Sequence, residues 1–238
     1  MYGSAGADIE QRLLDVVLAD QRQPLAAREL PAQGGLTRPR HSGNDEQAKL
    51  PHTRRMKPEK QTLHYTGRVI SVTADEVVLP NGHRATLDVV HHPGGAAIIA
   101  LDTQQRVCLL RQYRYVADGW IWELPAGKLE PNEPPLETAK RELIEEAGMT
   151  ARHWESLGTV FSSPGVFSEI LHLFYAAELE PAAVAHESAE VIEIHWVPFS
   201  EAYLWAMNGQ IRDAKTIIAL ARAFSIDAVR KGLAANNP

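Results

Sequence analysis

Cysteine is almost absent from this chain of 238 residues, in which Cys108 is the only one. A single cysteine excludes an internal disulfide, and such a composition is typical of proteins from a reducing compartment. Cys108 stands within the apolar run 107–110. Because a free cysteine in such a run behaves as a small apolar side chain, we interpret Cys108 as part of the core and not as a nucleophile.

Long apolar segments are also missing. The longest apolar run, 96–101, is far too short to cross a bilayer, which takes about 20 residues in a helix. The first residues, MYGSAGADIEQ, contain neither a basic start nor an apolar core, so they do not resemble a secretory signal. We therefore expect a cytoplasmic protein that has no membrane partner.

The chain has no excess of basic residues. Its 24 Lys and Arg stand against 30 Asp and Glu, a formal net charge of −6, which argues against general nucleic-acid binding. The charge does not bear on phosphate substrates that are handled through metal ions. The hydrophobic fraction of 45% and the charged fraction of 23% are those of an ordinary soluble protein. The length suffices for one or two domains with a buried core.

The first 60 residues differ from the rest of the chain. Apolar residues at helical spacing predict a short amphipathic helix over roughly 8–19, namely Ile9, Leu13, Val16 and Val17. Few large apolar residues follow. We interpret residues 1–60 as a disordered or flexible extension, with a docking arm or a partner-binding helix as the alternative.

Strand patterns begin after this extension. The runs 65–72, 76–79 and 84–90 predict an antiparallel meander within residues 61–92, and Asn81-Gly82 favours the positive φ of a tight hairpin turn. The pair His91-His92 follows it. Two histidines invite a metal site, but no Cys or third His stands at ligand spacing, so we interpret the pair as part of a turn.

The remainder of the chain, 93–228, predicts an α/β fold. Strand-like runs are found at 96–102, 106–112, 121–124, 155–160, 171–179 and 191–198. Two C-terminal helices are expected, one beginning at an N-cap Ser200 and ending at Asn208-Gly209, the other capped by Asp213. The apolar side of the second helix would consist of Ile217, Ile218, Leu220 and Ala221. Strands around a central helix, followed by helices, indicate an α/β/α sandwich with a mixed sheet.

The central helix lies in the stretch 127–149, GKLEPNEPPLETAKRELIEEAGM. Its prolines keep the first part in a loop, although Pro135 suits a first helical turn. Gly148 ends the helix, as a glycine after a helix commonly does. One face of the helix carries an apolar stripe at helical spacing, formed by Leu136, Ala139, Leu143 and Ala147.

A second face of this helix carries Glu142, Glu145 and Glu146, which are spaced i, i+3 and i+4. Most clusters of this kind are solvated acidic surfaces. Here Lys140 and Arg141 only partly offset the repulsion of three carboxylates. A hard divalent cation such as Mg²⁺ would convert that repulsion into binding. The spacing alone leaves a solvated face and a metal site as equal alternatives.

The stretch 127–149 resembles the Nudix box, G-x5-E-x7-R-E-U-x-E-E-x-G-U, in which U is an apolar residue. Every specified position is matched, by Gly127, Glu133, Arg141, Glu142, Leu143, Glu145, Glu146, Gly148 and Met149. The resemblance extends over roughly 62–223 and points to the ADP-ribose pyrophosphatase branch. The motifs that carry it lie at 111–115, 122–130, 163–165, 168–169 and 211–216.

This resemblance implies a Nudix α/β/α sandwich preceded by a small antiparallel β meander. It also implies that the protein hydrolyses the pyrophosphate bond of ADP-ribose to AMP and ribose 5-phosphate, with Mg²⁺ or Mn²⁺ as cofactor. Another nucleoside diphosphate sugar, such as GDP-mannose, or a dinucleotide is the alternative substrate. A non-catalytic ADP-ribose sensor is the alternative from another class of protein, and the intact box argues against it.

Residue roles follow from the same resemblance. The implied metal ligands are the Ala126 carbonyl, Glu142, Glu145 and Glu146. Arg141 would hold these carboxylates by ion pairing, and Glu133 would support the box. A glutamate of the loop 183–190 would act as the base toward the attacking water, with Glu190 preferred over Glu187.

The implied substrate contacts are Arg114, Glu123, Pro164 and Gly165. The family also implies a homodimer, in which the meander of one subunit helps to cover the site of the other. Arg68 and Arg84 would then reach the substrate from the partner subunit.

Overall fold

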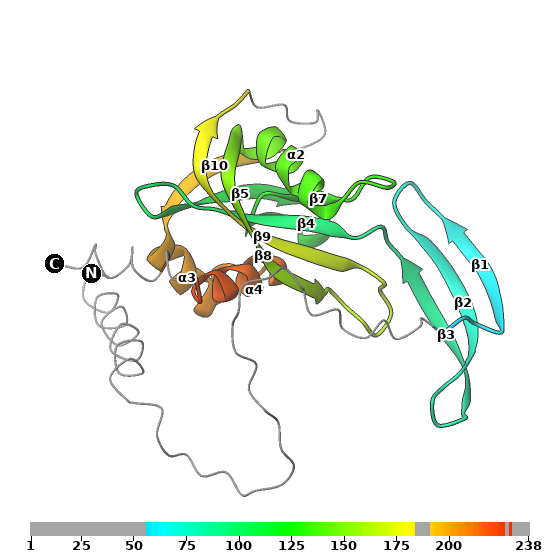
Figure 1. The fold of residues 1–238 in the computed structure, drawn as a ribbon. Helices are drawn as coiled ribbons and strands as arrows, with labels where there is room; N and C mark the ends of the chain where they lie inside the picture. The colour runs from blue at the N-terminus through cyan, green and yellow to red at the C-terminus, as the bar shows by residue number, and fades with distance from the viewer. Residues whose placement is uncertain (1–55, 184–190, 227–228, 230–238) are drawn as a thin grey trace, which may run out of the picture. The chain divides into compact units, whose positions relative to one another are not determined.

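The computed structural model describes residues 56–183, 191–226 and 229 (Figure 1). These residues belong to one compact unit, Met56–Pro238. The helix predicted over 8–19 lies outside the described residues, as does most of the extension predicted over 1–60. The division into 61–92 and 93–228 stays a prediction, because the compact unit spans both.

The described chain begins with a three-stranded antiparallel sheet in the order β1-β2-β3. Its strands are β1 (Lys60–Thr66), β2 (Ser71–Val78) and β3 (Arg84–His91). The predicted hairpin turn between β2 and β3 is confirmed, since Gly82 has φ +81° and donates to the Leu79 carbonyl at 2.8 Å. A continuous strand over 65–72 was the wrong prediction. The chain reverses there, with the Gly67 N–H on the Ile70 carbonyl, and no Asn-Gly or Pro signals that turn.

Two further sheets form the centre of the fold. One has the order β7-β4-β9-β8 and the other the order β10-β5-β6. The strands are β4 (Gly95–Ala100), β5 (Arg106–Arg114), β6 (Gly119–Glu123), β7 (Ala126–Lys128), β8 (Met149–Phe161), β9 (Ile170–Pro181) and β10 (Ile192–Pro198). The short 3₁₀ helix η1 (Tyr115–Ala117) joins β5 to β6. Because β4 pairs with β9 in parallel and with β7 in antiparallel direction, the sheet is mixed, as predicted.

Helices cover both faces of these strands (Figure 1), with α2 (Pro135–Ala147) on one side and α3 (Phe199–Met207) and α4 (Ala214–Ala223) on the other. Strand β4 shows why. Its side chains alternate between a core that includes α2 residues and a core that includes α3 and α4 residues, and every residue of the strand is buried. A strand covered on both faces reads as a continuous apolar run, which explains the run 96–101. The α/β/α sandwich is confirmed.

Cys108 lies on β5, fully buried in the core that faces α2. Burial, with Glu146 nearby, raises the pKa of its thiol to about 12. The interpretation of Cys108 as a core residue is therefore confirmed. None of the helices in the described part of the chain is long and apolar enough to cross a membrane.

The helix ends differ in part from the predictions. Gly148 ends α2 with φ +63°, and Asp213 caps α4 by accepting from the Thr216 N–H at 3.0 Å, so both of these predictions are confirmed. Ser200 was the wrong N-cap. The N-cap is Pro198, two residues earlier, and helix α3 starts at the fully buried Phe199, because β10 runs directly into it.

The predicted apolar side of α4 is also partly wrong. Ala221 is exposed, whereas Thr216, Ala219, Leu220 and Ala223 are buried. Thr216 is a polar residue whose hydroxyl donates to Asp213 Oδ2. A hydrophobic pattern does not predict its burial, because burial here depends on that hydrogen bond. The turn interpretation of the His91-His92 pair is wrong for His91, which is the last residue of β3 and pairs with Ser71, whereas His92 starts the link to β4.

Candidate active site

A cavity of about 510 Å³ opens where several parts of the chain meet. The start of β4, strand β7, helix α2, the end of β8 with the loop after it, and the start of α4 all contribute to its wall. The residues of α2 that line it are Arg141, Glu142, Glu145 and Glu146. The stretch that the sequence singled out therefore faces a cavity.

Two of the three α2 glutamates are buried. Glu142 is 8% exposed and Glu146 is 3% exposed, whereas the Glu145 side chain is 36% exposed. A solvated acidic surface leaves its carboxylates in water, so that interpretation is wrong for Glu142 and Glu146. Burying a carboxylate is costly unless it is paired and hydrogen-bonded. The fold must therefore supply partners for these side chains.

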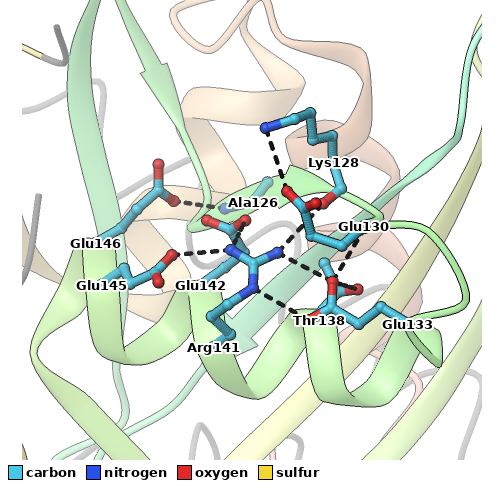
Figure 2. A network of polar contacts seen from close by, with 9 residues as sticks. All are labelled: Ala126, Lys128, Glu130, Glu133, Thr138, Arg141, Glu142, Glu145 and Glu146. Atoms are coloured by element: carbon cyan, nitrogen blue, oxygen red, sulfur yellow. Dashed lines mark hydrogen bonds and ion pairs between the residues drawn. The ribbon is translucent and has the colours of Figure 1, made fainter. Parts of the chain in front are cut away.

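Arg141 is the principal partner (Figure 2). Its Nη1 donates to Glu142 Oε1 at 2.7 Å and to Glu145 Oε2 at 2.9 Å. Its Nε donates to Glu133 Oε1 at 3.1 Å. Hydrogen bonding to Glu133, with the charges of Glu142 and Glu145, raises the pKa of Arg141 well above its ordinary value. One guanidinium thus holds three carboxylates, and the ion pairs predicted with Glu142 and Glu145 are present.

Glu133 joins the loop before α2 to the helix itself. Its Oε2 accepts from the Thr138 hydroxyl at 2.8 Å and from the Glu130 N–H at 3.1 Å. The hydrogen bond from Arg141 lowers the pKa of the Glu133 carboxyl to about 2. Glu133 does not line the cavity. It therefore acts on the cavity only through Arg141 and the loop.

Strand β7 lies against the α2 carboxylates. The Ala126 N–H donates to Glu146 Oε2 at 2.7 Å (Figure 2). At Gly127, an added Cβ would lie 1.8 Å from Glu142 Oε1 and 2.1 Å from its Cδ. Only glycine therefore allows the backbone to approach Glu142 this closely.

A second polar cluster lies beside these residues. Arg114 donates through Nε and Nη2 to both oxygens of Glu123, at 3.1 and 2.6 Å. The Lys215 Nζ lies 3.0 Å from Glu123 Oε2 and 3.1 Å from Asp213 Oδ1. Burial by itself raises the pKa of the Glu123 carboxyl, but the hydrogen bond from Arg114 and the charge of Lys215 outweigh it and lower the pKa.

The cavity wall includes Arg114, Asp213 and Lys215 but not Glu123, which is 4% exposed. The expected contact of Glu123 with a substrate is therefore indirect in this arrangement, through the two cations that it holds. Sequence reasoning did not assign Asp213 or Lys215 to the site. Their motif, 211–216, was noticed, but only the fold brings α4 to the end of β6.

The link between β3 and β4 forms another part of the wall. The His92 Nδ1 lies 3.2 Å from Glu169 Oε1 and 3.1 Å from the Gly94 N–H. The His92 N–H donates to the Ser168 hydroxyl at 3.0 Å. His92 and Glu169 both line the cavity, and sequence reasoning did not assign either of them.

The other predicted site residues lie away from this cavity wall. Pro164 and Gly165 are exposed in the loop between β8 and β9. Arg68 is exposed in the turn after β1, and Arg84 at the start of β3 pairs with Glu59. None of these four lines the cavity. The two candidate bases, Glu187 and Glu190, lie outside the described residues.

Hydrogen-bond donors of the chain contact the α2 carboxylates. Within the described residues, no three His, Cys, Asp or Glu side chains converge closely enough to hold a metal ion as they stand. The Arg141 guanidinium and the Ala126 N–H donate to oxygens of Glu142, Glu145 and Glu146.

Comparison with known proteins identifies the same region. The model of the NUDIX domain family matches residues 91–220. A methanol dehydrogenase activator from Bacillus methanolicus is 37% identical over 158 residues, 66% of this chain and 85% of that protein. An ADP-ribose pyrophosphatase from Bacillus subtilis (strain 168) is 35% identical over 158 residues, with the same coverage, 66% and 85%.

A solved structure shares the fold. The crystal structure of an ADP compounds hydrolase aligns with a TM-score of 0.59 at 20% identity, covering 76% of this chain and 98% of that chain. The residues matched by the family model, 91–220, include all of those that line the cavity.

Proposed function

Because this chain belongs to the Nudix family, we propose that it is a metal-dependent hydrolase that cleaves the pyrophosphate bond of ADP-ribose to AMP and ribose 5-phosphate. The observation that carries the proposal is the composition of one cavity wall. Buried carboxylates from α2 share that wall with the cations Arg114 and Lys215. Carboxylates can hold cations, and Arg and Lys can bind phosphate oxygens.

The donor set fits a hard divalent cation. Glu142, Glu145, Glu146 and the Ala126 carbonyl offer oxygen atoms, which Mg²⁺ and Mn²⁺ prefer. The missing side chain at Gly127 supports this fit, because it lets the backbone of β7 lie against Glu142. We assign these four residues as metal ligands. The bound ions would neutralise phosphate oxygens and lower the pKa of a water molecule.

Arg141 and Glu133 prepare this site. Arg141 holds the carboxylates in place before a cation binds, since it donates to Glu142 and Glu145. Glu133 fixes the guanidinium by accepting from its Nε. Catalysis depends on such residues because the ligand oxygens must already be positioned when the substrate arrives.

Arg114 is the proposed phosphate-binding residue. Its Nε and Nη2 are held by Glu123, and its side chain lines the cavity, so we assign its guanidinium to a phosphate oxygen of the substrate. Glu123 therefore contributes to substrate binding indirectly, because it orients Arg114. Pro164 and Gly165 shape the loop whose neighbours Ser162 and Glu169 line the cavity.

The general base is assigned to Glu190, with Glu187 as the alternative. Either carboxylate would take a proton from the attacking water, which assists displacement at phosphorus. Both assignments rest on the family resemblance. Replacing each by Gln in turn separates them, because only loss of the base lowers turnover while leaving substrate affinity intact.

We also propose a homodimer in which the β1–β3 sheet of one subunit helps to cover the site of the other. In support of it, β1 is exposed along its whole length in the single chain. Arg68 and Arg84 do not line the cavity of their own chain, so the partner's site is where they would serve. A cytoplasmic location is proposed from the single cysteine.

The alternative substrates are another nucleoside diphosphate sugar, such as GDP-mannose, or a dinucleotide. They share the pyrophosphate bond, so the metal site and Arg114 would serve all of them. The parts that differ are the nucleobase and the second sugar. A non-catalytic sensor is less favoured, because every box carboxylate is in place.

A substrate panel tests the proposal. The chain is incubated with Mg²⁺ and ADP-ribose, GDP-mannose, UDP-glucose, NADH or diadenosine polyphosphate, with alkaline phosphatase added to release phosphate only from cleaved products. We expect preference for ADP-ribose. In a parallel reaction without the phosphatase, which is itself a metalloenzyme, the AMP separated by chromatography should no longer form once EDTA is added. Preference for another compound would overturn the substrate. Binding of ADP-ribose without turnover would favour the sensor.

A further inference from the structure

The segment that leads from β6 to β7 is held at three consecutive residues. The Leu124 N–H donates to the Thr216 hydroxyl at 2.9 Å, the Pro125 carbonyl accepts from the Ile98 N–H at 2.9 Å, and the Ala126 N–H donates to Glu146 at 2.7 Å. Of these contacts, only the first comes from α4. The place of Ala126 at the cavity therefore depends on a threonine that is remote in sequence.

Thr216 is fully buried, and its hydroxyl has two defined partners. Because an amide N–H can only donate, the hydroxyl must accept from Leu124. Its own proton then goes to Asp213 Oδ2, which lies 2.6 Å away. A hydroxyl is one of the few groups that can accept and donate at one atom. Valine has the same shape but neither capacity.

These contacts close a ring at the cavity. Asp213 accepts from Thr216 and pairs with Lys215, and Lys215 pairs with Glu123, which precedes Leu124 in the chain. The ring joins the N-terminal end of α4 to the end of β6. Its members Asp213 and Lys215 line the cavity, whereas Thr216 does not.

We propose that Thr216 is a positioning residue for the hydrolysis. It sets the place of Ala126 through Leu124, and the place of Lys215 through Asp213, without touching the substrate. The inference rests on the proposed function, because it assigns a role in that reaction. Loss of its hydroxyl leaves the Leu124 N–H without an acceptor and frees the segment to shift away from Glu146.

The test compares Thr216→Val with Thr216→Ser, which keeps the hydroxyl. Steady-state kcat and KM for ADP-ribose are measured well below the melting temperature of each variant. We expect Thr216→Val to lower kcat by roughly 10- to 100-fold with little change in KM, because small misplacements of reacting groups carry costs of this size. Thr216→Ser should restore kcat to near the wild-type value.

Thr73→Val is the matched control. Thr73 is also buried and also donates to an aspartate, Asp75, at 2.8 Å, but its partners Asp75 and His91 are on the β1–β3 sheet and not on the segment from β6 to β7. Thr73→Val should lose stability and keep much more of its kcat than Thr216→Val. If Thr73→Val and Thr216→Val lower kcat equally, or Thr216→Val changes only the melting temperature, the positioning role is overturned. Should Thr216→Val not fold, Thr216→Cys replaces it, since a thiol is weaker in both roles.

Amide hydrogen exchange separates this inference from the proposed function. In Thr216→Val, exchange at Leu124 and Ala126 should become faster, while Thr73→Val leaves both rates unchanged. If the wild-type chain does not hydrolyse ADP-ribose, the proposed function fails, and these exchange rates alone decide whether Thr216 holds the segment. Unchanged rates would refute that part as well.

Discussion

The carboxylate of Glu142 occupies the space that a side chain at residue 127 would need. A Cβ on Gly127 would stand 1.8 Å from Glu142 Oε1, far inside van der Waals contact. Residue 127 is on β7 and Glu142 is on α2, so the glycine sets how closely the strand and the helix approach. The first glycine of the box is thereby explained by packing against a proposed metal ligand.

Gly127→Ala should therefore lower both stability and activity. The added methyl must displace Glu142, and overpacking of this kind costs about 1–3 kcal/mol. We expect kcat with ADP-ribose to fall at least about tenfold, since about 1.4 kcal/mol of lost transition-state stabilisation corresponds to tenfold in rate. Steady-state kinetics and a thermal melt check both effects.

Gly209→Ala is the control for that variant. Gly209 has φ +83° and nothing within 4 Å of an added Cβ, so alanine there costs backbone strain alone. The melting temperature of Gly209→Ala should fall, while its kcat should equal that of the wild type. Wild-type activity in Gly127→Ala would contradict the close packing of β7 on Glu142.

Glu146→Gln should abolish turnover and leave the fold intact. Its amide oxygen can still accept from the Ala126 N–H, but the charge that a cation requires is lost. A metal ion contributes several kcal/mol to the transition state, so we expect a loss of at least about 100-fold in kcat. Glu137→Gln, at an exposed residue that pairs with Lys140, is the control. Unchanged activity in Glu146→Gln would refute the metal assignment.

Arg114→Lys should weaken substrate binding. Lysine cannot reproduce the two parallel hydrogen bonds to Glu123, so its ammonium would not be aimed at the cavity. A hydrogen bond to a charged group is worth about 1.5–3 kcal/mol, which predicts a rise in KM of roughly 10- to 100-fold. Arg111→Lys on the same strand is the control, since Arg111 pairs with Glu193 and does not line the cavity. An equal effect of both substitutions would exclude a specific role for Arg114.

Glu133 should make stability depend on pH in the acidic range. Its folded-state pKa of about 2 lies below the ordinary value of 4.5. A depressed pKa stabilises the folded state above the unfolded-state pKa, and the contribution is lost as pH falls from about 4.5 toward 2. The free energy of unfolding of wild type should exceed that of Glu133→Gln by about 1 kcal/mol at pH 7, the upper range for a partly exposed pair.

Urea unfolding at pH 7, 4.5 and 3 measures this difference. The difference should be largest at pH 7, begin to shrink at pH 4.5 and be much smaller at pH 3. The reason is that the Glu133 carboxyl of the unfolded chain, whose pKa is higher, binds a proton while the folded carboxyl stays largely ionised. A difference that grows on acidification would mean that the pKa of Glu133 is raised in the folded state. Glu130→Gln serves as the control, since its exposed side chain pairs only at 3.7 Å with Lys128.

Local structure was largely readable from the residues themselves. The bounds of α2 followed from Pro135 and Gly148, and the β2–β3 hairpin followed from Asn81-Gly82, because each of these residues restricts its own backbone. The predictions of element bounds failed where the chain changes direction without a residue that restricts its own backbone. The turn at Gly67–Ile70 and the start of α3 at Phe199 are of this kind.

Long-range contacts decided the rest of the site. Helical spacing placed Glu142, Glu145 and Glu146 on one face, since the period of a helix is fixed by its backbone hydrogen bonds. Whether that face was solvated or buried depended on β7 and the loop before α2, which the spacing does not describe. The resemblance to the Nudix box favoured the site, and the burial of Glu142 and Glu146 explains it physically.

The sequence by itself determined the family, the central helix and the set of carboxylates, because these depend on residue types at short, regular spacing. Only the tertiary structure joined Thr216, Asp213 and Lys215 of α4 to Glu123 and Leu124 at the end of β6. These residues are about 90 positions apart, and their contact depends on how α4 packs on the sheet. Packing of this kind depends on the side chains of the whole core, so it cannot be predicted from a short stretch of sequence.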